Sequence, residues 1–330
     1  MKPTFGLRAS ARAFLSSALL ATVLHAPAAT AQQFPSKPVR IVVGFAAGGP
    51  TDVAARVVGQ KLAEKLGQQF VVDIRPGAGG NIAAEIVAKS PADGYTLLLP
   101  AFAHAVNPSL VAKLPYDADR DFAPVVMVAS AANILAIHPS VPARNLNEFI
   151  ALAKTKPGQL TFGSAGNGSA SHLAGELLNM MGGMKLTHIP YKGSAPASTD
   201  LIGGQITAAF PGVGIALPHV KQGRLRALGV TSLQRAKAMP DLPTISEAGL
   251  KGFEVISWYG LLAPAGTPQD IVQKINSEVL RTMREPDAVE RLASFGAEPV
   301  DNTPADFGAF IRREIAKWGK VVKTAGIRAD

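Results

Sequence analysis

Ile41–Asp52 reads IVVGFAAGGPTD. The three β-branched residues at its start predict a short buried strand, and the glycine pair ends that strand. The Pro-Thr-Asp that follows opens a helical pattern over residues 53–66, which stops at Gly67. A strand, a glycine turn and a helix start direct backbone N–H groups at one spot, which suits a small anion. The segment equally fits an ordinary strand-to-helix connection of an α/β domain, and alone it favours neither interpretation.

The first 31 residues have the pattern of a secretory signal peptide. Basic residues precede an apolar stretch of twelve residues, Ala13–Leu24, and Ala29-Thr30-Ala31 offers a small-x-small cleavage site. A membrane anchor is the alternative, but the apolar stretch is shorter than the roughly 20 residues that span a bilayer. We therefore expect residues 1–31 to be removed and the mature chain to be exported and soluble.

Composition limits the classes of partner. Removing 31 of the 330 residues leaves 299, enough for two lobes with a core each. The net charge of +9 falls to +6 when Lys2, Arg8 and Arg12 leave with the signal peptide, and this excess suits an anionic ligand. Nucleic acid fits poorly, because the longest basic run is Arg312-Arg313 and aromatic residues are scarce. The chain has no cysteine, which excludes disulfides and thiolate metal sites.

Strand-like and helix-like runs alternate along the chain. Strands are predicted at 39–43, 70–73, 95–99, 125–128, 134–137, 160–163, 187–190, 206–210 and 225–231, and helices at 51–66, 81–89, 146–155, 171–181, 196–203, 268–284 and 287–295. A last helix begins at a capping-box pattern, Thr303 and Asp306, and its apolar stripe from Phe307 to Val322 is interpreted as core. Such alternation predicts mostly parallel sheets flanked by helices.

Motifs for catalysis and for cofactors are absent from the sequence. A serine hydrolase would need a G-x-S-x-G elbow, and the segment Gly168–His172 only places hydroxyls beside an imidazole in sequence. The five histidines after residue 31 are scattered, which disfavours a metal site. No Walker loop or complete dinucleotide fingerprint occurs. We therefore predict no enzyme, no cofactor and no metal.

Two further turns are rich in hydrogen-bond donors. Gly163–Ser169 carries hydroxyls, an amide and glycine N–H groups, and Pro190–Ser194 adds a phenol, an ammonium and another helix start. Each residue has an ordinary alternative, such as a turn asparagine at Asn167 or a solvated charge at Lys192. Together, on an exported α/β chain without catalytic motifs, they favour recognition of a carboxylate.

The chain resembles the periplasmic solute-binding receptors of tripartite tricarboxylate transporters, the Bug or TctC-type family. The resemblance covers essentially the whole mature chain in order. It rests on FAAGGPTDVAAR (Phe45–Arg56), RPGAGGNIAA (Arg75–Ala84), ADGYTLLL (Ala92–Leu99), YDADRDFAPV (Tyr116–Val125), GSAGNGSASHLAGEL (Gly163–Leu177), HIPYKGSAPASTDLIGGQI (His188–Ile206), GRLRALGVTS (Gly223–Ser232), PDLPTISEAGLKGFE (Pro240–Glu254) and WYGLLAPAGTP (Trp258–Pro268).

The resemblance implies a two-lobed periplasmic-binding-protein (Venus flytrap) fold with two interlobe crossings. Lobe 1 would comprise residues 32–130 and 255–330, and lobe 2 residues 131–254. The ligand carboxylate would be held between the lobes by Ala47, Gly48, Thr51, Asp52, Ser164, Asn167, Gly168, Ser169, His172, Tyr191, Lys192 and Gly193. Among these, we interpret the acidic Asp52 as a cap or as an acceptor for water or an N–H.

Some positions depart from the pattern of the family. Phe102, His104 and Phe210 stand where smaller or polar residues are usual, which predicts a larger or more aromatic pocket, with core packing as the alternative. The resemblance implies a monomeric periplasmic protein that passes a small aliphatic or aromatic carboxylate to a membrane permease. The alternative is a sensor subunit that reports the ligand to a signalling partner.

Overall fold

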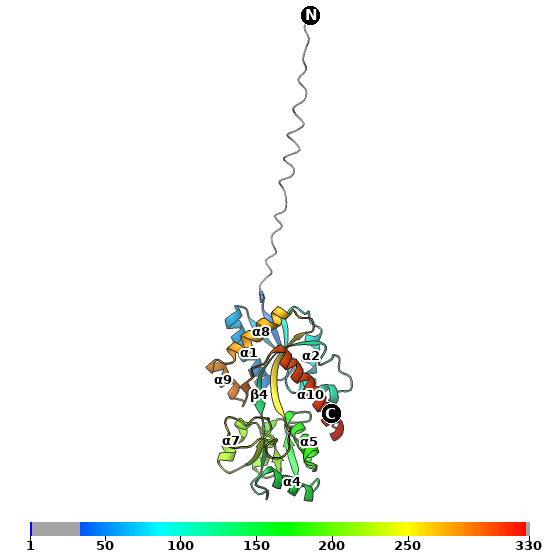
Figure 1. The fold of residues 1–330 in the computed structure, drawn as a ribbon, viewed down its shortest axis with the longest axis vertical. Helices are drawn as coiled ribbons and strands as arrows, with labels where there is room; N and C mark the ends of the chain where they lie inside the picture. Colours follow the sequence, from blue (N-terminus) through cyan, green and yellow to red (C-terminus); the bar gives the residue numbers. More distant parts are fainter. Residues whose placement is uncertain (2–33, 328–330) are drawn as a thin grey trace. The chain divides into compact units, whose positions relative to one another are not determined.

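The structure is a computed structural model that describes Met1 and residues 34–327. Strands and helices alternate along these residues, and the strands form two sheets (Figure 1). The predicted signal peptide, apart from Met1, lies outside the described residues. No helix in the described part of the chain combines the length and the apolarity needed to cross a bilayer.

The first sheet has six strands in the order β11-β4-β10-β3-β1-β2. They are β1 (Val39–Val43), β2 (Phe70–Ile74), β3 (Thr96–Leu99), β4 (Phe122–Ala132), β10 (Ile256–Pro264) and β11 (Glu298–Pro299). β1 runs parallel to β2 and β3, whereas β10 is antiparallel to β3 and β4, and β11 is antiparallel to β4. The helical elements of this part are α1 (Pro50–Leu66), η1 (Ala78–Gly80), α2 (Asn81–Ala88), α3 (Ala103–Leu110), α8 (Gln269–Thr282), α9 (Pro286–Ala293) and α10 (Pro304–Ala325).

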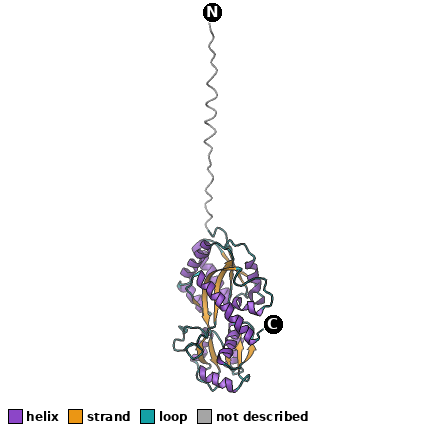
Figure 2. Ribbon diagram, turned by 45° about the vertical axis from the view of Figure 1, so that its right-hand side comes forward, coloured by secondary structure: helices purple, strands orange, loops and turns teal. Residues whose placement is uncertain are grey.

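The second sheet has five strands in the order β7-β6-β8-β5-β9. They are β5 (Ile134–Ile137), β6 (Thr161–Ser164), β7 (Thr187–Pro190), β8 (Ala208–Ala209) and β9 (Arg226–Val230), with helices α4 (Leu146–Thr155), α5 (Ala170–Gly182), α6 (Ser194–Ile202) and α7 (Val213–Lys221). β6 is parallel to β7 and β8, and β5 is antiparallel to β8 and β9. Figure 2 shows strands with helices on either side in both parts. The prediction of mostly parallel sheets is wrong, because only four of the nine strand pairings described are parallel. Parallel pairing is confined to the neighbours of β1 and β6, where strand-turn-helix units follow one another, whereas the strands next to the two crossings, β4, β5 and β10, pair antiparallel.

The chain passes between the sheets twice. β4 ends at Ala132 and β5 begins at Ile134, and the chain returns to the first sheet where β10 begins at Ile256. Both sheets belong to one compact unit, Lys37–Asp330. The lobe boundaries at 130/131 and 254/255 therefore stay a prediction.

The C-terminal helix α10 packs its apolar stripe into the core, as its periodicity predicts. The Thr303 hydroxyl accepts from the Asp306 N–H at 3.1 Å, and the Asp306 carboxylate accepts from the Thr303 N–H at 3.0 Å, which completes the predicted capping box. Phe307 and Trp318 are fully buried, and Trp258 of β10 packs edge-on against Phe307 at 5.7 Å. Core packing, rather than a partner-binding face, accounts for the stripe.

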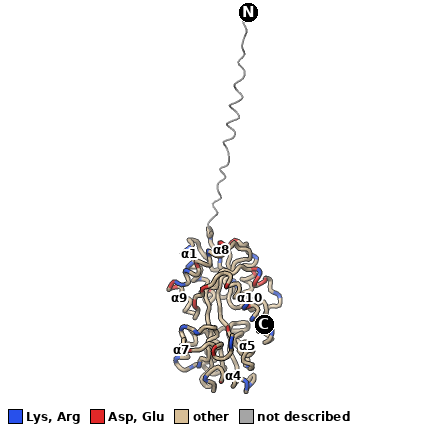
Figure 3. Tube along the Cα trace, viewed as in Figure 1, with Lys and Arg blue, Asp and Glu red and all other residues tan. Residues whose placement is uncertain are grey.

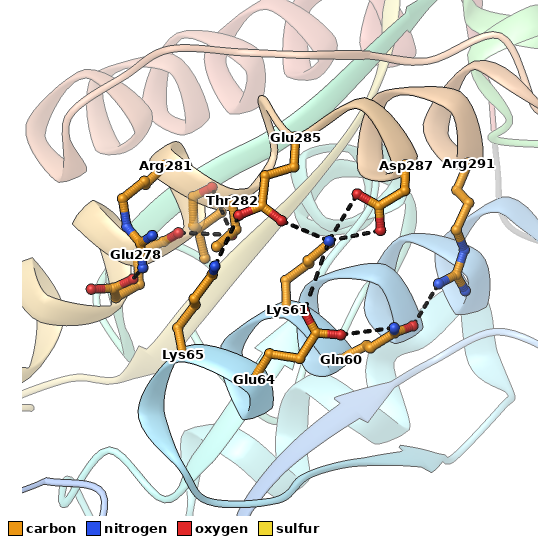
Figure 4. Close-up of polar contacts among 11 residues, drawn as sticks. Gln60, Lys61, Glu64, Lys65, Glu278, Arg281, Thr282, Glu285, Asp287 and Arg291 are labelled. Atoms are coloured by element: carbon orange, nitrogen blue, oxygen red, sulfur yellow. Dashed lines mark hydrogen bonds and ion pairs between the residues drawn. The ribbon is translucent and has the colours of Figure 1, made fainter.

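A buried lysine ties α1 to the turn between α8 and α9 (Figure 4). The side chain of Lys61 is only 7% exposed, and its Nζ lies 2.7 Å from carboxylate oxygens of both Glu285 and Asp287. The hydrogen bonds that the Lys61 ammonium donates to Asp287 and Glu285 raise the pKa of Lys61, so it is charged at neutral pH. Lys65 adds a contact to Glu285 at 3.2 Å. These contacts fix the helix whose first turn belongs to the predicted site.

Candidate functional site

The side chain of Asp52 forms a hydrogen bond within the turn that follows β1. The Gly48 N–H donates to Asp52 Oδ2 at 2.8 Å, and Arg56 Nε lies 2.8 Å from Oδ1. Burial would raise the pKa of Asp52, but the hydrogen bonds from Arg56 and Gly48 outweigh burial and hold the pKa below its usual value. The carboxylate is thus ionised and accepts an N–H within its own turn.

Other donors of this turn have no acceptor in the described part of the chain. Helix α1 begins with Pro50, which has no N–H, and the first backbone bond into the helix runs from the Val53 N–H to the Gly49 carbonyl. The N–H groups of Thr51 and Asp52 find no acceptor among the described residues. Ala47 and Gly48 are exposed, whereas Thr51 is buried. Two amides therefore remain available at the positive end of α1.

The turn between β6 and α5 is held by its own side chains. Ser169 is the N-cap of α5: its Oγ accepts from the His172 N–H at 3.2 Å and donates to the Gly166 carbonyl at 2.7 Å. The Gly168 N–H donates to His172 Nδ1 at 3.1 Å. Gly166 and Gly168 have φ values of 122° and 72°, which favour glycine. Asn167, at the tip, is exposed.

The turn between β7 and α6 is hydrogen-bonded to the turn after β6. The Tyr191 N–H donates to the Ser164 carbonyl at 3.1 Å, and the Gly193 N–H donates to the Ala165 carbonyl at 3.2 Å. The Tyr191 hydroxyl donates to Asp200 at 2.7 Å, and burial, with Asp200, raises the pKa of Tyr191 to about 12. The ammonium of Lys192 is exposed. The structure thus brings the predicted residues of lobe 2 together as one pair of turns, Ser164–Ser169 and Tyr191–Gly193.

Phe102, His104 and Phe210 are buried in the interior of the protein. Phe102 packs edge-on against Trp318 at 5.1 Å, and Phe210 is 2% exposed. His104 Nε2 lies 3.0 Å from the Ala118 carbonyl, and burial lowers the pKa of His104 to about 4, so its imidazole is neutral at pH 7. His104 borders one cavity of about 10 Å³ and Phe210 borders another. The structure shows core packing for all three, and their predicted part in ligand selectivity stays a prediction.

Two residues near the turns were not predicted. His188 Nε2 lies 2.6 Å from Ser164 Oγ, and Ser171 Oγ accepts from the Ala165 N–H at 2.9 Å. Both residues lie within quoted motifs, but the partner of His188 is 24 residues away in sequence. The parallel pairing of Phe162 with His188 brings His188 close to Ser164. Predicting the register between β6 and β7 would therefore have revealed this contact.

The predicted residues form two groups, one on each sheet. No contact described for residues 34–327 joins the turn Ala47–Asp52 to the pair of turns on the second sheet. The end of α3 does reach that pair, because a Cβ built on Gly168 would lie 2.8 Å from Leu110 Cδ1. Acidic and basic residues are interspersed along the described chain (Figure 3). Among these residues, no group of three or more His, Asp or Glu side chains could hold a metal ion.

Two sheets joined by two crossings, with donor-rich turns after parallel strands, define a periplasmic binding protein. Residues 54–327 match the family model described as "Tripartite tricarboxylate transporter family receptor". The chain therefore belongs to the tripartite tricarboxylate transporter receptor family, which also contains the Bug proteins. This is a family of binding proteins and not of enzymes, which agrees with the sequence-based prediction.

Known relatives match this chain over nearly their whole length. The protein BugT of Bordetella pertussis is 38% identical over 311 residues, which cover 94% of this chain and 95% of BugT. The structure of Rpa4515 of R. palustris with adipate is 40% identical, with a TM-score of 0.74, and the match covers 89% of this chain and 99% of that one. MatC (Rpa3494) from Rhodopseudomonas palustris with bound malate is 35% identical, with a TM-score of 0.71 and coverage of 88% and 100%. These matches confirm the predicted fold class and family.

Proposed function

We propose that this protein captures a small carboxylate between its two lobes and passes it to a tripartite tricarboxylate-type membrane permease, acting as a monomer in the periplasm after loss of residues 1–31. Membership in the receptor family supports the role. The relatives Rpa4515 and MatC, whose structures hold adipate and malate, support a dicarboxylate. The observation that carries the proposal is that the charged Lys192 lies directly before the start of α6, beside the pair of turns Ser164–Ser169 and Tyr191–Gly193.

The donors that remain unused indicate where a carboxylate would bind. The N–H groups of Gly48, Gly168 and Gly193 already donate within the protein. At the start of α6, the N–H groups of Ser194 and Ala195 have no acceptor among the described residues. Lys192, beside them, forms no ion pair with any described residue. We therefore assign one carboxylate of the ligand to Lys192 and the start of α6.

The start of α1 offers a second place of the same kind. Thr51 and Asp52 provide two backbone amides there, and the positive end of a helix favours an anion. A dicarboxylate could therefore engage one helix start with each of its ends. In this proposal the other predicted residues of the turns shape the walls: Ala47, Gly48, Asn167, Ser169, Tyr191 and Gly193 are at least partly exposed, whereas Ser164, Gly168 and His172 are buried and support them. Phe102, His104 and Phe210 belong to the buried interior.

A ligand screen tests the proposal. Residues 32–330 would be titrated with aliphatic and aromatic mono-, di- and tricarboxylates, including adipate and malate, while thermal unfolding is followed. A ligand at about 100 times its Kd adds roughly 2.7 kcal/mol to the free energy of unfolding and raises Tm. The absence of a shift with every carboxylate would contradict the proposed ligand class. Chemical conversion of a bound ligand, detected by chromatography, would contradict a pure binding role.

A matched pair of lysines tests the assigned contact. Lys192→Gln should weaken binding about tenfold or more, because a charge-assisted hydrogen bond is lost. Lys221→Gln changes a lysine that is also exposed and ends α7, outside the two turns, and it should leave affinity unchanged. Equal affinities in the two variants would remove Lys192 from the site.

A further inference from the structure

Ser164 Oγ lies between a donor and an acceptor. Ser164 ends β6 and is 1% exposed, its Oγ accepts from the Gly166 N–H at 3.1 Å, and His188 Nε2 lies 2.6 Å away. A hydroxyl carries one proton. The short contact to Nε2 is the better place for that proton than the Gly166 carbonyl at 3.3 Å. The two distances therefore favour an imidazole with an unprotonated Nε2.

The surroundings of His188 favour that neutral ring. Burial lowers the pKa of His188 to about 4, so the imidazole carries no charge at pH 7. One face of the ring stacks on Phe162 of β6 with centroids 4.9 Å apart, and the ring also stacks on His172 of α5 at 3.8 Å. Packing on both neighbours fixes the orientation of the ring as well as its charge state.

The two stacked imidazoles hold both ends of one turn. His188 Nε2, from β7, lies 2.6 Å from Ser164 Oγ, while His172 Nδ1, from α5, accepts from the Gly168 N–H at 3.1 Å. A ring that accepts a hydrogen bond does so through an unprotonated nitrogen. Around the stack, β6 contributes Ser164 and Phe162, and α5 contributes His172 and Glu176, whose carboxylate lies 3.9 Å from His172 Nε2. Burial raises the pKa of Glu176.

We propose that His188 is a positioning residue of the ligand site, which accepts a hydrogen bond from the Ser164 hydroxyl and, with His172 stacked on it, holds the turn Ser164–Ser169 in its binding arrangement. This inference rests on the proposed function for its effect on affinity. Its effect on the turn is independent of any ligand. A protonated ring would present a donor where an acceptor is needed, so acidification would release the turn.

Two substitutions separate the hydrogen bond from the packing. His188→Phe keeps a flat ring for the stack but has no acceptor, whereas His188→Gln retains an acceptor that can reach the Ser164 hydroxyl. His138→Phe is the control, because His138 contacts Ser140 and lies outside the turns. Amide hydrogen exchange of residues 164–169 in the ligand-free protein at pH 7 should be about tenfold faster in His188→Phe. His188→Gln and the control should stay near the wild type.

The affinity for adipate and the protonation state of the His188 ring in the wild type provide further readouts. His188→Phe should bind adipate about tenfold more weakly, His188→Gln should restore most of that loss, and the loss of affinity between pH 7 and pH 4 should be smaller in His188→Gln. In the wild type, imidazole nitrogen shifts at pH 7 should show Nε2 of His188 without a proton. A proton on Nε2 of His188 in the wild type would overturn the inference, and this test does not depend on the folding of any variant. Equal amide exchange in the wild type and in His188→Phe would overturn it as well. Absence of adipate binding with faster exchange in His188→Phe would count against adipate as a ligand while supporting the positioning role.

Discussion

The carboxylate of Asp52 accepts a hydrogen bond from the Gly48 N–H at 2.8 Å. This contact uses one of the amides that the sequence offers as an anion cradle. It also keeps an ionised carboxylate, paired with Arg56, inside the turn. The predicted anion site after β1 therefore has fewer free amides than its glycines suggest, and the start of α1 supplies those that remain.

Replacing Asp52 should loosen this turn. Asp52→Ala removes the acceptor of the Gly48 N–H and the partner of Arg56, and should lower the free energy of unfolding by about 1–3 kcal/mol. Asp52→Asn retains an acceptor of the same shape and should recover part of the loss. Urea unfolding measures both. Asp270→Ala, in the exposed first turn of α8, should change stability by less than about 0.5 kcal/mol. A comparable loss at Asp270 would show that the effect is not specific to the turn.

The hydroxyl of Ser169 gives a second prediction. Since it caps α5 and donates to the Gly166 carbonyl, Ser169→Ala should lower stability by about 1 kcal/mol and weaken carboxylate binding by loosening the turn. Asn145→Ala removes the cap of α4, whose side chain accepts from the Glu148 N–H at 2.9 Å. It should lower stability by a similar amount without changing affinity. Unaltered affinity in Ser169→Ala would remove Ser169 from the site.

Elements that are specified by residues close together in sequence could be predicted. The capping box at Thr303 and the stripe of α10 are visible as patterns, because caps and periodicity depend on neighbours in sequence. Strand β10 was not predicted, since ISWYGLLAP has a glycine in its middle and pairs with β4 through register shifts. Helix α3 was also not predicted, because it contains Pro108, and its N-cap residue, Phe102, is held by packing on Trp318. Long-range contacts decide both elements.

The candidate site was predicted at the level of turns but not of atoms. The three segments that follow β1, β6 and β7 are visible from glycines and donor residues. Whether a donor is free depends on the dihedrals of the turn, as with Gly48, whose N–H is taken up by Asp52. The contact of His188 with Ser164 depends on strand register, which the glycine and donor pattern does not reveal.

Lys61 gives a prediction about stability that is independent of the site. Lys61→Met keeps the buried stem and removes the charge that pairs with Glu285 and Asp287, and should cost roughly 1–3 kcal/mol because the partners are partly solvated. Lys89→Met removes an exposed pair with Glu85 and should cost less than about 1 kcal/mol. Chemical unfolding at pH 7 compares the two. Equal losses would contradict a special role for the buried lysine.

The pH dependence of the Lys61 variant follows from the direction of each pKa. The pairs lower the pKa of Glu285 and of Asp287, so their contribution to stability is present above the usual carboxyl range and is lost as pH falls through it. The pKa of Lys61 is raised, so its contribution is lost only in strong base. The difference between wild type and Lys61→Met should therefore be constant near neutrality and shrink below about pH 4.

The last prediction concerns His104 and the dependence of the free energy of unfolding on pH below neutrality. Burial lowers its pKa from 6.5 to about 4, so the folded chain keeps a neutral ring where the unfolded chain binds a proton. The free energy of unfolding should thus decrease as pH falls from 6.5 to 4, by up to roughly 3 kcal/mol from this residue. His104→Gln can still donate to the Ala118 carbonyl but does not titrate, so its profile should be flatter, with the slope from His188 remaining. His138→Gln should keep the wild-type slope, and an unchanged slope in His104→Gln would show that another group sets the acid limit.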